Sequence, residues 1–291
     1  MQEERTKLKK LIDEEGKELE AEMSFFDHLD VLRGHLIRAA IAIVIFAVAA
    51  FSYYSFIFDE IIMGPGRVDF WTYRIMCAAV EKFNLGSEFC VTKLNYTIIN
   101  TQLGGQFTLQ LNSSLMIGIV LGFPYLLFEI WRFVKPALHE KERNSATGFV
   151  FWASLLFIIG LLFGYYVVSP LSINFLANFE VSKIINNTIT IDSYFSIIAT
   201  LSIGSAITFE LPTIIFILSK LGIMTPQFMR ASRRYSTVII LIIAAVVTPT
   251  PDLIIMFTVS LPLFLLYEVS IYISAIVQRN KTKADIEFYK V

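Results

Sequence analysis

The stretch YFSIIATLSIGSAITFELPTIIFILS, Tyr194 to Ser219, holds one acidic or basic side chain in 26 residues. At 1.5 Å per residue, a helix of this length is about 39 Å long, more than the roughly 30 Å hydrocarbon core of a bilayer. A segment so long and so apolar is typical of a transmembrane helix. The stretch therefore predicts an integral membrane protein.

The composition of the whole chain agrees with this interpretation. Of the 291 residues, 55% are hydrophobic, and the mean hydropathy is +0.64. The formal net charge is −1, which argues against a nucleic-acid binder, because such proteins carry a basic patch or stripe. The length fits one membrane bundle and leaves no room for a second large domain.

Similar apolar runs recur along the chain and predict an all-α protein with six transmembrane helices. We expect a charged tail over residues 1–24, a membrane domain over residues 25–277 and a second charged tail over residues 278–291. The predicted spans are residues 36–58, 107–134, 149–168, 194–219, 235–248 and 253–277.

The last two predicted spans are short. The 14 residues of 235–248 cover about 21 Å as a helix, less than the hydrocarbon core. Such a pair implies a locally thinner bilayer or shielding by neighbouring helices. Two prolines in VVTPTPDL, residues 246–253, interrupt the helix between the fifth and sixth predicted spans. A re-entrant hairpin is the alternative.

The basic residues predict the orientation. Eighteen of the 24 Lys and Arg residues lie in four segments that together hold 80 residues: 1–36, 132–145, 220–234 and 277–291. The segments between them, 59–106, 169–193 and 248–252, hold five. Because loops rich in Lys and Arg stay in the cytoplasm, both termini are predicted to be cytoplasmic.

Both cysteines of the chain, Cys77 and Cys90, fall in the long segment 59–106. This segment is predicted to lie outside, where an oxidising environment allows a disulfide. The alternative is two free, partly buried thiols. The chain has no Cys and His spacing typical of a metal site, and we expect neither a metal nor a cofactor.

Glu210 is unusual because it is an acid inside an apolar run. It lies ten residues before Lys220, the first charged residue after that run. Ten helical residues span about 15 Å, so the carboxyl group is predicted near the bilayer midplane. An acid at that depth usually faces a cavity or a partner. Pro212 lacks an N–H and leaves the carbonyl of Thr208 without its helical partner. The two residues together predict an intramembrane polar site, and a protonated structural acid is the alternative.

Two other acids, Glu129 and Glu268, lie near the predicted cytoplasmic ends of their spans. We expect them to reach water or headgroups, beside the interfacial aromatic residues Trp131 and Tyr267. The chain has no H-E-x-x-H, G-x-S-x-G or P-loop motif and no nucleophile–base pair inside a span. An enzyme is therefore not expected.

Five short motifs occur in order along the chain. They are HLDVLRGHL at residues 28–36, a pattern of aromatic residues and prolines over residues 124–143, FELP at residues 209–212, TPTPD at residues 248–252 and an L-P to Y-E pattern over residues 261–268. Together they resemble the motifs of the TatC family, the large subunit of the twin-arginine protein translocase. The resemblance covers about residues 25–277. Its structural motif residues are Pro124, Trp131, Phe133, Pro136, Pro249, Asp252, Pro262 and Glu268.

The resemblance implies a concave, glove-like bundle in the bacterial plasma membrane. It implies that the protein recognises twin-arginine signal peptides of folded precursors at the cytoplasmic face. It further implies single-span TatA- and TatB-type partners, self-association in a larger complex, and protein export driven by the proton-motive force.

The resemblance also assigns residues. Glu142 matches the family acid that contacts the arginine pair, which fits the bidentate pairing of guanidinium and carboxylate. Arg143 and Arg33 match the motifs. The second family acid falls on Val31, with Asp30 one place earlier, and the second family arginine is His35. Asp30 is thus a weaker candidate, since one residue turns a helical side chain by about 100°.

The same resemblance places Glu210 and Pro212 in the concave face, in contact with a partner helix or an inserted signal. A proton-coupled transporter of a small solute is the competing interpretation, with Glu210 as its proton carrier. Such transporters usually show internal repeats and paired broken helices, which this sequence lacks.

Overall fold

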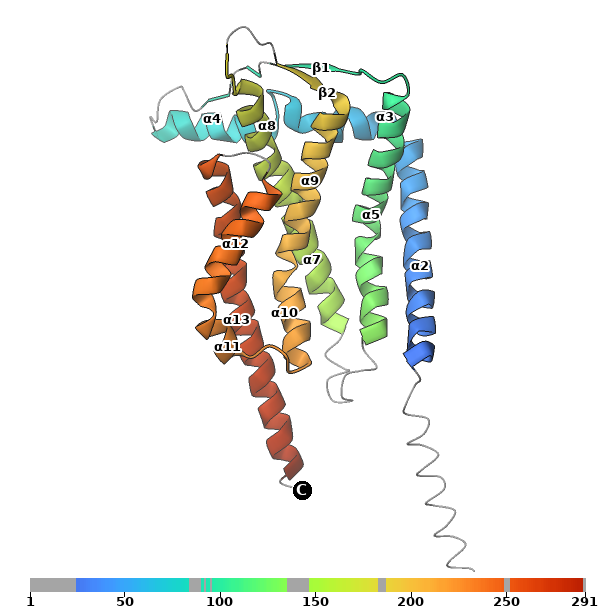
Figure 1. Ribbon diagram of the computed structural model, residues 1–291, viewed down its shortest axis with the longest axis vertical. Helices are drawn as coiled ribbons and strands as arrows, with labels where there is room; N and C mark the ends of the chain where they lie inside the picture. The colour runs from blue at the N-terminus through green and yellow to red at the C-terminus, as the bar shows by residue number, and fades with distance from the viewer. Residues whose placement is uncertain are drawn as a thin grey trace, which may run out of the picture.

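The computed structural model describes residues 25–83, 90–91, 93–94, 96–134, 147–182, 187–248 and 252–289. Within them the protein is mostly helical, and its longer helices lie side by side along the long axis (Figure 1). They are α2 (Phe25–Ser52), α5 (Gly105–Val134), α7 (Thr147–Phe163), α9 (Ile191–Phe209), α10 (Leu211–Lys220), α12 (Arg233–Val247) and α13 (Leu253–Tyr289).

Among the described residues, five helical segments are long and apolar enough to cross a membrane. They are Asp30–Ser52, Gly105–Val134, Gly148–Asn178, Ile191–Lys220 and Leu253–Asn280. The fifth predicted span, residues 235–248, corresponds to α12, which has only 15 residues. A sixth crossing by α12 therefore stays a prediction, although α12 packs beside α13 in the bundle.

Two helical segments run further than the sequence indicated. The third predicted span, which was expected to end at Val168, continues through the π-helix η6 (Gly164–Val168) into α8 (Ser169–Asn178). Pro170 lies in the first turn of α8, where a missing N–H costs little. Charged residues after Val277 do not end α13, which continues to Tyr289.

Small residues allow close contact between helices. A Cβ atom added at Gly118 of α5 would lie 2.7 Å from the Ile43 carbonyl oxygen of α2. One at Gly122 would lie 2.8 Å from the Ile43 side chain. Glycines four residues apart are a common way for membrane helices to approach one another. They hold α2 against α5 along the length of both helices.

The end of the bundle opposite the start of α2 carries α4 (Trp71–Phe83), which lies crosswise, and the strands β1 (Thr97–Ile99) and β2 (Thr188–Thr190) (Figure 1). The two strands pair in parallel, with Ile98 opposite Ile189. The Tyr73 hydroxyl donates to the Pro170 carbonyl at 2.8 Å, and a disulfide joins Cys77 to Cys90. The strand pairing and the Tyr73 bond join the two segments at this end, and the disulfide closes a loop within the first of them.

The short elements complete the description. They are α3 (Tyr54–Phe56), the π-helix η1 (Ile57–Ile62), the 3-10 helix η2 (Gly64–Gly66) and α11 (Pro226–Ala231). The start of α2 and the last helical turns of α13 lie at the same end of the bundle (Figure 1). That end also carries the connection from α10 to α11.

Candidate functional site

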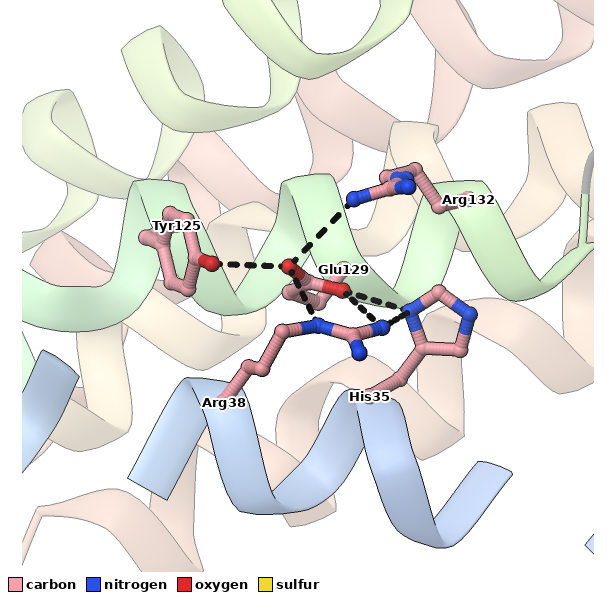
Figure 2. Close-up of polar contacts among 5 residues, drawn as sticks. All are labelled: His35, Arg38, Tyr125, Glu129 and Arg132. Carbon is pink, nitrogen blue, oxygen red and sulfur yellow. Dashed lines mark hydrogen bonds and ion pairs between the residues drawn. The ribbon is translucent and has the colours of Figure 1, made fainter. Parts of the chain in front are cut away.

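A buried carboxylate joins α2 to α5 near the start of α2. Glu129 of α5 is 1% exposed. Its Oε2 lies 2.5 Å from His35 Nδ1 and accepts from Arg38 Nη2 at 3.2 Å. Its Oε1 accepts from Arg38 Nε at 3.3 Å and from the Tyr125 hydroxyl at 2.8 Å (Figure 2). Arg132 Nη1 approaches Oε1 at 3.8 Å.

These contacts explain how an acid can be buried at this position. A carboxylate out of water needs charged or hydrogen-bonding partners, and charge-assisted bonds are the strongest available. Arg38 and His35 come from α2, three residues apart and therefore on one face of the helix. Tyr125 and Arg132 lie one turn before and after Glu129 on α5. Both oxygens of Glu129 are thus satisfied by groups from two helices.

The cluster of His35, Arg38, Tyr125, Glu129 and Arg132 has more basic than acidic groups. One carboxylate faces two guanidinium groups and an imidazole (Figure 2). The side chains of Arg38 and Arg132 are 46% and 53% exposed, so both also reach out of the bundle. The cluster fixes the start of α2 to the last turns of α5.

The residues predicted to recognise a signal peptide lie around this cluster only in part. Asp30 and Arg33 are exposed on the first turns of α2. Glu142, Arg143 and Pro136 lie outside the described residues. His35, which stands where the family motif has arginine, is buried against Glu129 rather than exposed.

Glu129 was expected to reach water or headgroups, and this expectation is wrong. Its carboxylate is satisfied inside the protein instead, by partners 91 and 94 residues away along the chain. The sequence contained a partial signal: His35 and Arg38 are three residues apart, and Tyr125, Glu129 and Arg132 share one face of α5. Nothing in the sequence indicated that these two faces meet.

Glu210 has the opposite environment. It lies between the end of α9 and the start of α10 and is 6% exposed. Among the described residues, no hydrogen bond of good geometry reaches either of its carboxylate oxygens. Pro212 occupies the first turn of α10. The Thr208 hydroxyl donates to the carbonyls of Gly204 and Ser205. The helix is therefore broken at Glu210, where the sequence placed Pro212 and the acid together.

An apolar hollow of about 360 Å³ lies beside this break. Pro212, Thr213 and Phe216 of α10 line it, together with Phe149 and Trp152 of α7. Its volume is at the lower end of the range of small ligand sites. The hollow gives the region around the helix break room for a side chain from another molecule.

The remaining motif residues pack or form hydrogen bonds and ion pairs within the bundle. Trp131 is buried and lies with its ring 4.3 Å from that of Phe149, and Phe133 lies edge-on to His35. Pro124 and Pro262 lie inside α5 and α13. Asp252 Oδ1 accepts from the Ile254 amide at the start of α13. Glu268 pairs with Arg233 at 2.7 Å, while Pro249 lies outside the described residues.

No metal site is formed within the described ranges, where no three His, Cys, Asp or Glu side chains gather closely enough to hold an ion. Carboxylates, guanidinium groups and apolar hollows offer recognition of charged and apolar peptide segments.

Comparisons with known proteins agree on one family. The family model described as Sec-independent protein translocase protein (TatC) matches residues 27–262. A Sec-independent protein translocase protein TatC of Blattabacterium sp. subsp. Periplaneta americana (strain BPLAN) is 35% identical over 89% of this chain and 98% of its own length. The corresponding TatCy protein of Bacillus subtilis (strain 168) is 33% identical over 90% of this chain and 93% of its own length.

Solved structures give the same result. A crystal structure of Twin Arginine Translocase Receptor TatC matches with a TM-score of 0.61 and 27% identity, and the match covers 86% of this chain and 99% of that one. A second, of the same receptor in DDM, has a TM-score of 0.64 and 28% identity over 85% and 99% of the two chains.

Proposed function

Because the chain belongs to the TatC family of Sec-independent protein translocase proteins, we propose that it is the receptor that binds twin-arginine signal peptides of precursor proteins. A role in twin-arginine translocation and a multi-pass membrane location follow from the family. The relatives are named as protein translocase components, which is a non-enzymatic role. One solved relative is described as the twin-arginine translocase receptor.

The observation that carries the proposal is the cluster around Glu129. It fixes the start of α2, which bears Asp30 and Arg33, to the end of α5, which leads toward Glu142. Two segments that are about 100 residues apart in the sequence are thus brought to one end of the bundle (Figure 1). In the proposal, the carboxylates of Asp30 and Glu142 bind the two neighbouring arginines of the signal, because each guanidinium binds a carboxylate bidentately.

The remaining roles follow from the same proposal. The end with Asp30 and Arg33 faces the cytoplasm, in agreement with the excess of Lys and Arg there. Single-span TatA- and TatB-type proteins assemble with the bundle in the plasma membrane, and the proton-motive force drives export. Glu210 is the intramembrane contact for a polar group of a partner helix or an inserted signal, since its buried oxygens accept no hydrogen bond within the described ranges.

Binding of a purified twin-arginine precursor to the full chain in detergent or nanodiscs tests the receptor function. Glu142→Ala should weaken this binding at least tenfold, since it removes a charge-assisted contact worth about 1.5–3 kcal/mol. Asp30→Ala should have a smaller effect. Glu60→Ala is the matched control, because Glu60 is an exposed acid at the opposite end of the bundle.

Two outcomes would contradict the proposal. One is unchanged precursor binding in Glu142→Ala together with Asp30→Ala. The other is equal binding of a precursor whose arginine pair has been replaced by two glutamines. Loss of binding in the Glu60→Ala control alone would place recognition at the opposite end.

A further inference from the structure

The junction between α11 and α12 carries three arginines in five residues: Arg230, Arg233 and Arg234. All three are exposed. Arg233 Nη2 pairs with Glu268 Oε2 at 2.7 Å. Among the residues that the structure describes, Arg230 and Arg234 have no carboxylate partner. Two guanidinium groups thus lie close together in the chain without a counter-ion from these residues.

The packing of α11 turns these groups outward. Met229 is 1% exposed and packs against Ile215 and Ile271. Its carbonyl accepts a hydrogen bond from the Tyr267 hydroxyl at 2.9 Å. Because Met229 points into the bundle, its neighbours point away from it, and Phe228 is 58% exposed. The inner face of α11 is therefore occupied, and the opposite face is open.

The chain turns between α11 and α12 at Ser232, whose φ of −87° and ψ of 4° depart from helical values. The Ser232 amide donates to the Phe228 carbonyl and the Ser236 amide donates to the Ser232 carbonyl, both at 2.9 Å. Arg230 and Arg234 lie on either side of this turn, four residues apart in the chain. Their two guanidinium groups can therefore bind one anionic group together.

An apolar stripe continues from these arginines along α12. Its members are spaced three or four residues apart, which places them on one face of the helix. Each is more than half exposed. They are Tyr235 (74%), Val238 (56%), Ile242 (56%) and Val246 (77%).

We propose that this surface, formed by Phe228, Arg230, Arg234 and the α12 stripe, binds an anionic phospholipid. Arg230 and Arg234 hold the phosphodiester group, because a guanidinium fork matches the geometry of phosphate oxygens. Phe228 and Tyr235 lie at headgroup depth, where aromatic side chains are enriched. One acyl chain lies along the α12 stripe. A zwitterionic lipid binds less well, since its own ammonium group competes with the arginines for the phosphate.

The test compares lipid retention in nanodiscs of phosphatidylcholine with and without phosphatidylglycerol, counted by native mass spectrometry. The wild-type chain should retain phosphatidylglycerol in preference to phosphatidylcholine. Arg230→Gln together with Arg234→Gln should lower the affinity for phosphatidylglycerol by a factor of about five for each arginine. The matched control is Arg67→Gln with Arg74→Gln, which removes the same charge at the other end of the bundle and should leave retention unchanged.

Three results would overturn the proposal. They are equal retention of the two lipids by the wild type, unchanged retention by the Arg230 and Arg234 variant, and an equal loss in the control. If that variant unfolds, Arg234→Lys alone replaces it: lysine keeps the charge but lacks the fork, so retention should fall by less than fivefold, and no fall contradicts the proposal. Loss of a co-purifying single-span partner with unchanged lipid retention would assign the surface to a protein instead.

Discussion

Glu129 and Glu210 are both buried acids in apolar helices, and their surroundings are opposite. Glu129 has four partner side chains from two helices, whereas neither oxygen of Glu210 accepts a hydrogen bond from the part of the chain that the structure describes. A fully partnered acid holds a structure together, and an unpartnered one costs stability unless another molecule completes it. Under the proposed function, Glu129 stabilises the end that binds the signal peptide, and Glu210 is left for contact with another molecule.

The largest expected effect comes from removing the α2 partners of Glu129. His35→Leu with Arg38→Leu should lower the free energy of unfolding by about 3 kcal/mol, at the lower end of the range for breaking a buried pair because Arg38 is half exposed. Thermal unfolding in detergent measures the change. Arg33→Leu, on the same helix and exposed, is the control.

A third substitution sharpens this prediction. Adding Glu129→Leu to the double variant should restore most of the lost stability, because a buried ion pair can be replaced by apolar side chains of similar volume. A triple variant as unstable as the double one would show that burial of an unpaired carboxylate is not the cause.

Close approach of α2 and α5 supports the same cluster and gives the next prediction. Gly118→Ala should destabilise the bundle by about 1–3 kcal/mol, since the new Cβ meets the backbone of Ile43 and Ala47 within 2.8 Å. Gly148→Ala is the matched control, because a Cβ there meets only Trp152, at 3.9 Å. Equal melting temperatures for both variants would contradict the role of this contact.

Replacing Glu210 by an apolar residue should stabilise the protein but weaken its contact with partner helices. Glu210→Leu should raise the free energy of unfolding by about 1–2 kcal/mol, because it removes an unsatisfied buried polar group. It should also weaken cross-linking to TatA- and TatB-type helices, while Glu210→Gln should keep assembly if the acid is protonated when it acts. A Glu210→Leu variant with unchanged cross-linking would refute the contact role, whatever its stability.

The smallest effect is expected at the exposed pair of Arg233 and Glu268. Both side chains are 53% exposed, and exposed pairs contribute about 0.2–1 kcal/mol. Arg233→Ala should therefore change the melting temperature little, and the small change should shrink further in high salt. If Arg233→Ala lowered the stability as much as the His35 and Arg38 double variant does, solvent exposure would not explain why the two ion pairs differ in strength.

The membrane fold could be predicted from the sequence because apolar runs and basic segments are local patterns. The interruption of the helix at Glu210 was also predictable from a local pattern, since Pro212 lies two residues away. The cluster around Glu129 was not, because it depends on which faces of α2 and α5 meet. The extensions into α8 and along α13 were missed because the predicted spans ended with their apolar runs, at Val168 and Val277. A helix can continue with polar residues outside the hydrocarbon core.

The centre of the bundle is closely packed. Val168, Leu201, Ala244 and Leu263 have no exposed surface, and the hollow beside Pro212 holds about 360 Å³. A folded domain of 100 residues has a radius of gyration of about 13 Å, whereas packed helix axes are only about 8–10 Å apart. The described part of one chain therefore has no lumen through which a folded cargo could pass. Under the proposed function, a conduit for a folded protein is therefore bounded by several molecules, with this chain as one part of its wall.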